Sequence, residues 1–117
     1  MEFRRRVPRV AADGWSGRYI IEDDPDSNWS DCRVLDISVI GVGLELFGDA
    51  SFDLVGHRLV VQVQAPVGES VSLRLAGRVM NQSKGPQSGT RAGLEFVGLS
   101  EAERSILKVL EIMKVAW

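Results

Sequence analysis

The feature that most constrains the fold of this chain is an alternation of apolar and polar residues with a period of two. It is clearest at Val42, Leu44 and Leu46, and it recurs in several short segments separated by turn residues. Successive side chains of an extended strand point to opposite faces, so this pattern is typical of strands that bury one face. The sequence predicts strands at residues 17–21, 32–38, 41–47, 57–65, 71–79 and 91–97. In the segment 32–38, the alternation predicts that Asp36 shares a face with Cys32 and Val34.

One helix is expected after the last strand. Ser100 and Glu103 have the spacing of a capping box, in which each side chain bonds the other residue's backbone N–H. The apolar residues that follow at helical spacing are Ile106, Leu107, Leu110 and Met113. Several short strands and one amphipathic helix predict a mainly β fold, a small antiparallel barrel with the helix covering an open side.

The chain divides into three parts of one domain. Residues 1–13 are expected to form an N-terminal arm, because Pro8 discourages helix at the residue before it. Residues 14–99 would form the barrel and 100–117 the helix. Two polar segments, the acidic 22–31 and the segment 81–90, are predicted to be loops.

Composition excludes several classes of protein. The chain has one cysteine, Cys32, and one histidine, His57, so neither a disulfide framework nor a structural zinc site is expected. Cys32 is predicted to be a small buried residue and His57 a surface or edge residue. No apolar stretch approaches the roughly 20 residues of a membrane-spanning helix, and no secretory signal is visible. A cytoplasmic location without membrane insertion is therefore expected. No nucleophile–base pair, metal cluster or glycine-rich phosphate loop points to an enzyme.

The net charge of −2 conceals a basic cluster at the N-terminus. Four of the 14 basic residues, Arg4, Arg5, Arg6 and Arg9, fall within the first nine positions. Guanidinium groups offer planar pairs of donors that match phosphate oxygens or the O6 and N7 edge of guanine. A cluster of this kind standing alone is more often a solvated basic tail.

A second motif follows at the end of a predicted strand. Asp36 and Ser38 are two residues apart and are expected to share a face, which places a carboxylate beside a hydroxyl. Gly41 is expected to allow unusual backbone angles and close approach of a ligand, and Gly43 adds room. The alternative is a turn in which Asp36 and Ser38 bond the local backbone.

Together the two motifs carry a resemblance. R-x-x-x-R at Arg5 and Arg9, followed by D-x-S-x-x-G at Asp36, Ser38 and Gly41, resembles the PilZ domain family. The likeness continues through the segments ISVIGVGLEL, Gly77-Arg78-Val79 and RAGLEFVGLSEAERSILKVLE. It covers the chain from Arg4 to about Glu111.

The resemblance implies a six-stranded antiparallel β-barrel with a C-terminal α-helix and a flexible, arginine-rich arm. It also implies a bacterial receptor for the second messenger cyclic di-GMP, with no cofactor, acting on a downstream effector protein. Arg5 and Arg9 would grip phosphates and guanines, with added contacts from Arg4 and Arg6. The barrel half of the binding site would be Asp36, Ser38, Gly41 and Gly43. Binding would order the arm, in a monomer or in a dimer linked by the ligand.

The sequence differs from the family pattern at one place, and two other functions are considered. Family members often have a Trp shortly after Gly-Arg-Val, whereas this chain has Met80, Asn81 and Gln82. Trp15 or Trp29 could supply the missing ring. The second function is a nucleotide-independent adaptor that keeps the barrel. A barrel for single-stranded nucleic acid is disfavoured, because it would need basic and aromatic residues interleaved on the strands.

Overall fold

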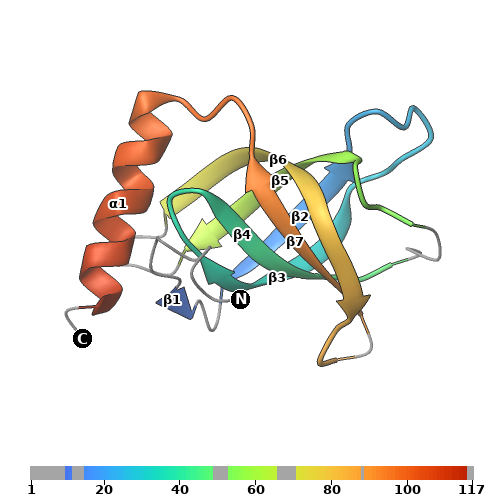
Figure 1. Ribbon diagram of the computed structural model, residues 1–117, viewed down its shortest axis with the longest axis horizontal. Helices are drawn as coiled ribbons and strands as arrows, with labels where there is room; N and C mark the ends of the chain where they lie inside the picture. Colours follow the sequence, from blue (N-terminus) through green and yellow to red (C-terminus); the bar gives the residue numbers. More distant parts are fainter. Residues whose placement is uncertain (1–9, 12–14, 49–52, 66–70, 88, 116–117) are drawn as a thin grey trace.

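The computed structural model describes residues 10–11, 15–48, 53–65, 71–87 and 89–115. They form seven strands and one helix, shown in Figure 1. The elements are β1 (Val10–Ala11), β2 (Ser16–Ile21), β3 (Ser30–Ile37), β4 (Gly41–Leu46), β5 (Arg58–Ala65), β6 (Val71–Lys84), β7 (Thr90–Phe96) and α1 (Glu101–Val115).

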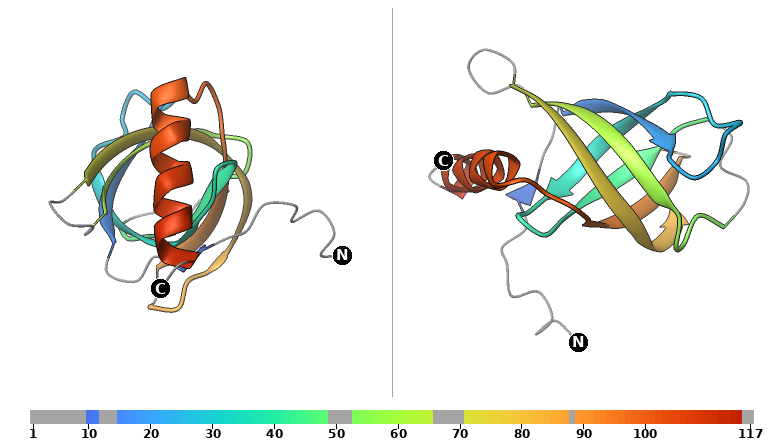
Figure 2. Two further views of the ribbon diagram at one scale, coloured as in Figure 1. Left: turned by 90° about the vertical axis from the view of Figure 1, so that its left-hand side faces the viewer. Right: turned by 90° about the horizontal axis from the view of Figure 1, so that it is seen from above.

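Six of the strands close into an antiparallel barrel. The order β3-β2-β5-β6-β7-β4 returns to its start because β3 also pairs with β4. This confirms the six-stranded antiparallel barrel that the sequence predicted. Closure removes the exposed sheet edges that an open sheet of this size would present. In the left view of Figure 2, α1 lies across one end of the barrel, as predicted.

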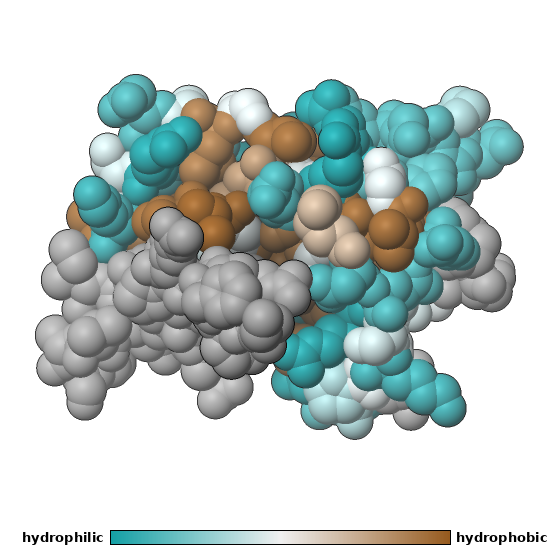
Figure 3. Space-filling view, in the orientation of Figure 1, coloured by the Kyte–Doolittle hydropathy of each residue, from teal (hydrophilic) through white to brown (hydrophobic). Residues whose placement is uncertain are grey.

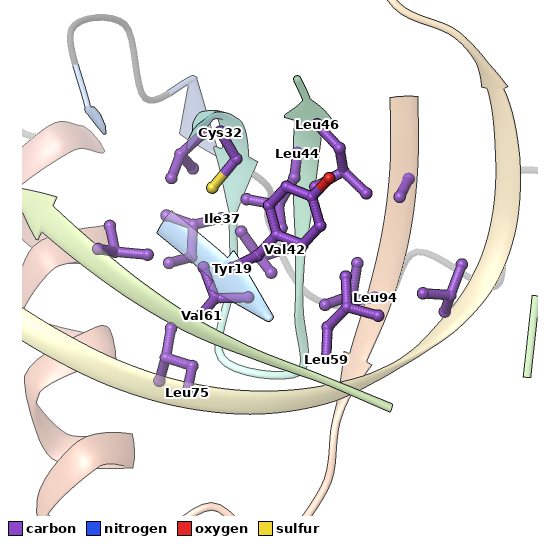
Figure 4. Packing of buried hydrophobic residues seen from close by; sticks show 14 of the residues in the cluster. Tyr19, Cys32, Ile37, Val42, Leu44, Leu46, Leu59, Val61, Leu75 and Leu94 are labelled. Atoms are coloured by element: carbon purple, nitrogen blue, oxygen red, sulfur yellow. The ribbon is translucent and has the colours of Figure 1, made fainter. Parts of the chain in front are cut away.

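The inside of the barrel is filled by the apolar members of the alternating pattern. On β4, Val42, Leu44 and Leu46 are at most 1% exposed. Residues from the other strands of the barrel meet them in a single cluster (Figure 4). Cys32 belongs to this cluster, and burial raises the pKa of its thiol to about 12. The thiol therefore stays protonated and is a packing group, as predicted.

Two β-bulges break the alternation. In β3 the register with β4 shifts between Val34 and Asp36, and in β6 the register with β7 shifts between Val79 and Asn81. The extra residue in β3 turns Ile37 into the core, where it is 4% exposed. The predicted placement of Asp36 on the face of Cys32 and Val34 was therefore wrong.

The polar segment 81–90 is also not a loop throughout. β6 continues to Lys84 and β7 begins at Thr90, so the connection is limited to residues 85–89. The prediction failed because polar residues can extend a strand wherever a partner strand supplies the backbone bonds, and β7 pairs with β6 as far as Lys84.

The capping box at the start of α1 is confirmed. The Ser100 N–H donates to Glu103 Oε1 at 3.1 Å, and the Glu103 N–H donates to Ser100 Oγ at 3.1 Å. In the predicted apolar stripe, Leu107 is 2% exposed and packs in the core, whereas Ile106 is 37% exposed. The side chains of Leu110 and Met113 lie outside the described residues.

Candidate functional site

The predicted site residues of the barrel come together where β3 turns into β4. Asp36 lies near the end of β3, Ser38 and Gly41 bound the turn, and Gly43 is on β4. The four predicted arginines of the arm, Arg4, Arg5, Arg6 and Arg9, lie outside the described residues.

Ser38 shapes the turn between β3 and β4. Its side chain is 2% exposed, and its Oγ accepts from the N–H groups of Ile40 and Gly41, both at 3.2 Å. The Ser38 N–H donates to the Gly41 carbonyl at 2.9 Å. Ser38 therefore has the local backbone bonding that the sequence left open as the alternative.

Gly41 does not have the unusual backbone angles that were expected of it. The glycines with positive φ in the described part of the chain are Gly48, Gly56 and Gly98. The expectation of unusual backbone angles at Gly41 was therefore wrong. The Gly41 N–H donates to Ser38 Oγ.

The most distinctive feature of this face is a row of four residues in register across four strands. Asp36 of β3 pairs with Gly43 of β4, Gly43 pairs with Gly93 of β7, and Gly93 pairs with Asn81 of β6. These strands lie next to one another in Figure 1. We call these residues the glycine row.

The side chains at the two ends of the glycine row lean inward over the glycines. A Cβ placed on Gly43 would lie 2.8 Å from Asp36 Oδ1. A Cβ placed on Gly93 would lie 2.7 Å from Asn81 Oδ1 and 2.8 Å from its Nδ2. Glycine is therefore needed at both positions to leave space for a carboxylate and a carboxamide.

Asn81 and Gly93 were missed by the sequence analysis as site residues. Asn81 was assigned to a loop, and its place on the row depends on the bulge in β6. One signal was available: the triplet Gly-Leu-Glu occurs at 43–45 and again at 93–95, in two predicted strands. In the structure these triplets lie on paired strands.

The arm approaches the glycine row through β1. Val10 pairs with Ile37, and Ala11 pairs with Asp36. Two residues that the sequence assigned to the arm thus form a strand beside the D-x-S-x-x-G segment. Arg9 directly precedes this strand in the sequence.

A buried carboxylate supports the same face. Glu45 is fully buried and accepts from Arg33 Nε at 3.0 Å and from the N–H groups of Gln87 at 2.6 Å and Gly89 at 3.0 Å. Burial alone would raise the pKa of Glu45, but these hydrogen bonds outweigh it and lower the pKa. The carboxylate fixes the connection between β6 and β7 against β4.

Two side chains of the acidic segment 22–31 form polar contacts with residues at the start of β5. Asp23 Oδ1 lies 3.2 Å from His57 Nδ1, and Glu22 Oε2 lies 3.5 Å from Arg58 Nε. The hydrogen bond with His57 is the main cause that lowers the pKa of Asp23. His57 is thus at a strand edge on the surface, as predicted.

Neither described tryptophan lies on the glycine row. Trp15 is 3% exposed in the core. The ring of Trp29 faces the guanidinium groups of Arg18 on β2 and Arg74 on β6, each 5.9 Å from the ring centroid.

Two further findings concern the described residues alone. They contain no group of three or more His, Cys, Asp or Glu side chains placed to hold a metal ion. Their one helix, α1, lacks the length and apolar character needed to cross a membrane.

Comparisons with solved structures agree with this fold. The chain is 19% identical to YcgR from Escherichia coli in complex with c-di-GMP, with a TM-score of 0.72 over 94% of this chain and 45% of that one. The PilZ domain of the same protein with c-di-GMP gives 18% identity and a TM-score of 0.69 over 97% and 92% of the two chains. The Bacillus subtilis inhibitor of motility, MotI/DgrA, gives 19% identity and a TM-score of 0.66 over 89% and 47%.

The chain thus spans less than half the length of two of these structures. A search of curated proteins found no match. The family comparison is decisive: the model of the PilZ domain matches residues 3–110, nearly the entire sequence. This chain belongs to the PilZ domain family.

Proposed function

We propose that this chain is a receptor for cyclic di-GMP, in which the arginines of the arm and the glycine row are the two halves of one site. The observation that carries the proposal is the pairing of Ala11 with Asp36, which brings the chain that follows Arg9 to the D-x-S-x-x-G segment. Further support is that two of the similar structures, both of YcgR, are complexes with c-di-GMP.

The chemistry of the ligand suits these residues. Cyclic di-GMP has two phosphates, which guanidinium groups bind through paired donors, and two guanines. Arg5 and Arg9 are assigned to the phosphates and guanine edges, with Arg4 and Arg6 as neighbours that add positive charge. Asp36 is assigned to a guanine, because a carboxylate accepts from the donors on its base edge. Ser38 and Gly41 hold the turn that positions Asp36.

Signal relay follows from the position of the arm. A ligand held by both halves would fix residues 1–9 against the barrel and so create a new surface for a downstream protein. The energy for this ordering comes from contacts that form only in the bound state.

Isothermal titration calorimetry with cyclic di-GMP tests the proposal. The wild type is expected to bind, and Arg5→Ala, Arg9→Ala and Asp36→Ala are each expected to weaken binding by roughly 1–3 kcal/mol, as the loss of a charged hydrogen bond does. Arg104→Ala is the matched control, because Arg104 is an exposed arginine of α1 that belongs to neither motif. No heat at tens of micromolar would refute the proposal, and variants that bind like the wild type would refute the assignments.

The second candidate is a nucleotide-independent adaptor, and an apolar surface favours it. A hollow of about 190 Å³ beside the start of α1 has apolar lining residues, among them Val60, Ala76, Val97 and Leu99, and two charged ones, Arg74 and Glu103. Figure 3 shows apolar surface gathered next to the helix. A protein partner that binds equally with and without cyclic di-GMP would favour this function over the receptor.

A further inference from the structure

We propose that Asn81 is a base-reading residue that acts with Asp36 to select guanine. The inference rests on the proposed function, because it concerns the part of the ligand that lies over the glycine row. It assigns a role to a residue that the sequence motifs do not contain.

The two ends of the glycine row have matched geometry. Asp36 and Asn81 each lean over the glycine of the next strand, with polar atoms 2.7–2.8 Å from where a Cβ would be. Cβ positions directly opposite on paired antiparallel strands are about 4.5–5.5 Å apart. The carboxylate and the carboxamide therefore lie over neighbouring positions, above a floor of backbone that a flat ring can approach.

Asp36 and Asn81 both follow a β-bulge. The register shifts in the described strands lie between Val34 and Asp36 and between Val79 and Asn81. A bulge turns the residues after it and is common next to binding sites, where it re-aims a side chain. Here two bulges, on strands that flank the glycine pair, aim two polar groups at the same surface.

The Asp36 carboxylate and the Asn81 carboxamide have complementary chemistry. Asn81 is exposed, and its carboxamide makes no hydrogen bond with the described residues. A carboxylate only accepts, whereas a carboxamide both donates and accepts. The pairing edge of guanine has donors at N1 and N2 and an acceptor at O6, which the two groups complement. Adenine places an acceptor at N1, facing the Asp36 carboxylate, and is disfavoured.

Calorimetric titration of cyclic di-GMP, with cyclic di-AMP as its competitor, tests the inference. Asn81→Ala is expected to weaken cyclic di-GMP binding about three- to tenfold, the worth of one or two neutral hydrogen bonds. The affinity ratio between the two nucleotides should fall, because guanine O6 accepts from the carboxamide N–H groups, whereas the amino group that adenine carries at that position cannot accept. Asn81→Asp keeps the shape of the side chain but removes its donor, and should weaken cyclic di-GMP binding further.

Two controls separate reading of the base from structural damage. Ser83→Ala changes an exposed residue two positions along β6 and should leave both affinities unchanged. Asn81→Ala combined with Gly93→Ala fills the floor, and it removes the three Asn81 atoms that lie nearest to a Cβ at Gly93. This double variant should fold and should bind more weakly than Asn81→Ala alone.

The outcomes distinguish failure of the proposed receptor function from failure of the role of Asn81. A wild type that does not bind cyclic di-GMP overturns the proposed function and this inference with it. A wild type that binds, with Asn81→Ala unchanged in affinity or weakened equally for both nucleotides, overturns the role of Asn81 alone.

Discussion

At the scale of single residues, the side chains of Asp36 and Asn81 occupy the space that a larger residue would need at Gly43 and Gly93. In Gly43→Ala the new methyl group would lie 2.8 Å from Asp36 Oδ1, so the carboxylate must turn away. Binding of cyclic di-GMP is expected to weaken by roughly 1–3 kcal/mol in calorimetric titration, as in Asp36→Ala.

A double-mutant cycle provides the control for this prediction. If Gly43→Ala acts by displacing Asp36, then combining it with Asp36→Ala should cost no more than Asp36→Ala alone. Losses that simply add would contradict the role given to Gly43.

Glu45 gives the stability of the domain a dependence on pH. Because its pKa is lowered on folding, its contribution is fully present above the ordinary glutamate value of about 4.3 and is lost as the pH falls through the lower folded value. Glu45→Gln removes this titration and loses an acceptor for Arg33, Gln87 and Gly89. Urea unfolding is expected to find it less stable than the wild type at pH 7, with the difference shrinking towards pH 3.

The matched control for Glu45 is Glu95→Gln on the neighbouring strand, since Glu95 is exposed. It should leave the stability at pH 7 nearly unchanged. A Glu45→Gln variant that is as stable as the wild type at pH 7 would contradict the anchoring role of the carboxylate.

The role of a residue could be predicted where it belongs to a local motif, but not where it depends on the register between strands. Asp36, Ser38 and Gly41 were found as a motif with Gly43 beside it, and Cys32 was found as a buried residue. Asn81 reaches the row through a bulge, and Glu45 is buried because Gly85, Gln87 and Gly89 lie against its carboxylate. Neither the bulge in β6 nor the burial of Glu45 is indicated by a sequence pattern within a few residues of Asn81 or Glu45.

At the scale of elements, the start of α1 depends on two reciprocal hydrogen bonds. Ser100→Ala removes the acceptor for the Glu103 N–H and is expected to lower the free energy of unfolding by about 1 kcal/mol. Chemical denaturation followed by circular dichroism measures this loss. Ser100→Asp, which retains an acceptor at the N-cap, should restore most of the stability. Equal loss in both variants would indicate that the cap does not hold the helix.

The strands show why element type was easier to predict than element length. Period-two alternation identified five of the six barrel strands, because a closed barrel buries one face of each strand. The sixth, β2, was predicted as a short strand at residues 17–21. The ends of β6 and β7 could not be found in this way, since both strands extend beyond the apolar pattern in the polar segment from Asn81 to Thr90. The bulge in β3 shifted the alternation midway, so Ile37 rather than Asp36 faces the core.

At the scale of the whole molecule, the described part of the arm joins the barrel through one short backbone pairing. β1 is two residues long and pairs with Ile37 and Asp36. Short edge pairings of this kind open with little cost in free energy. The rest of the barrel is a closed ring around one core, so ligand binding should alter the arm far more than the strands β2 to β7.

Hydrogen–deuterium exchange measured by mass spectrometry tests this expectation. With saturating cyclic di-GMP, peptides covering residues 1–11 should exchange more slowly, because a ligand held by the arginines and by Asp36 prevents β1 from opening. At a ligand concentration 100 times the Kd, the linkage is worth about 2.7 kcal/mol, which corresponds to roughly a hundredfold slowing for amides that exchange only when the ligand dissociates. Peptides from β5 should change little. In Asp36→Ala the protection of residues 1–11 should be reduced at the same nucleotide concentration, in proportion to the loss of affinity. Equal exchange of residues 1–11 with and without a bound ligand would mean that the arm does not carry the signal, and the relay would then have to use another surface of the barrel.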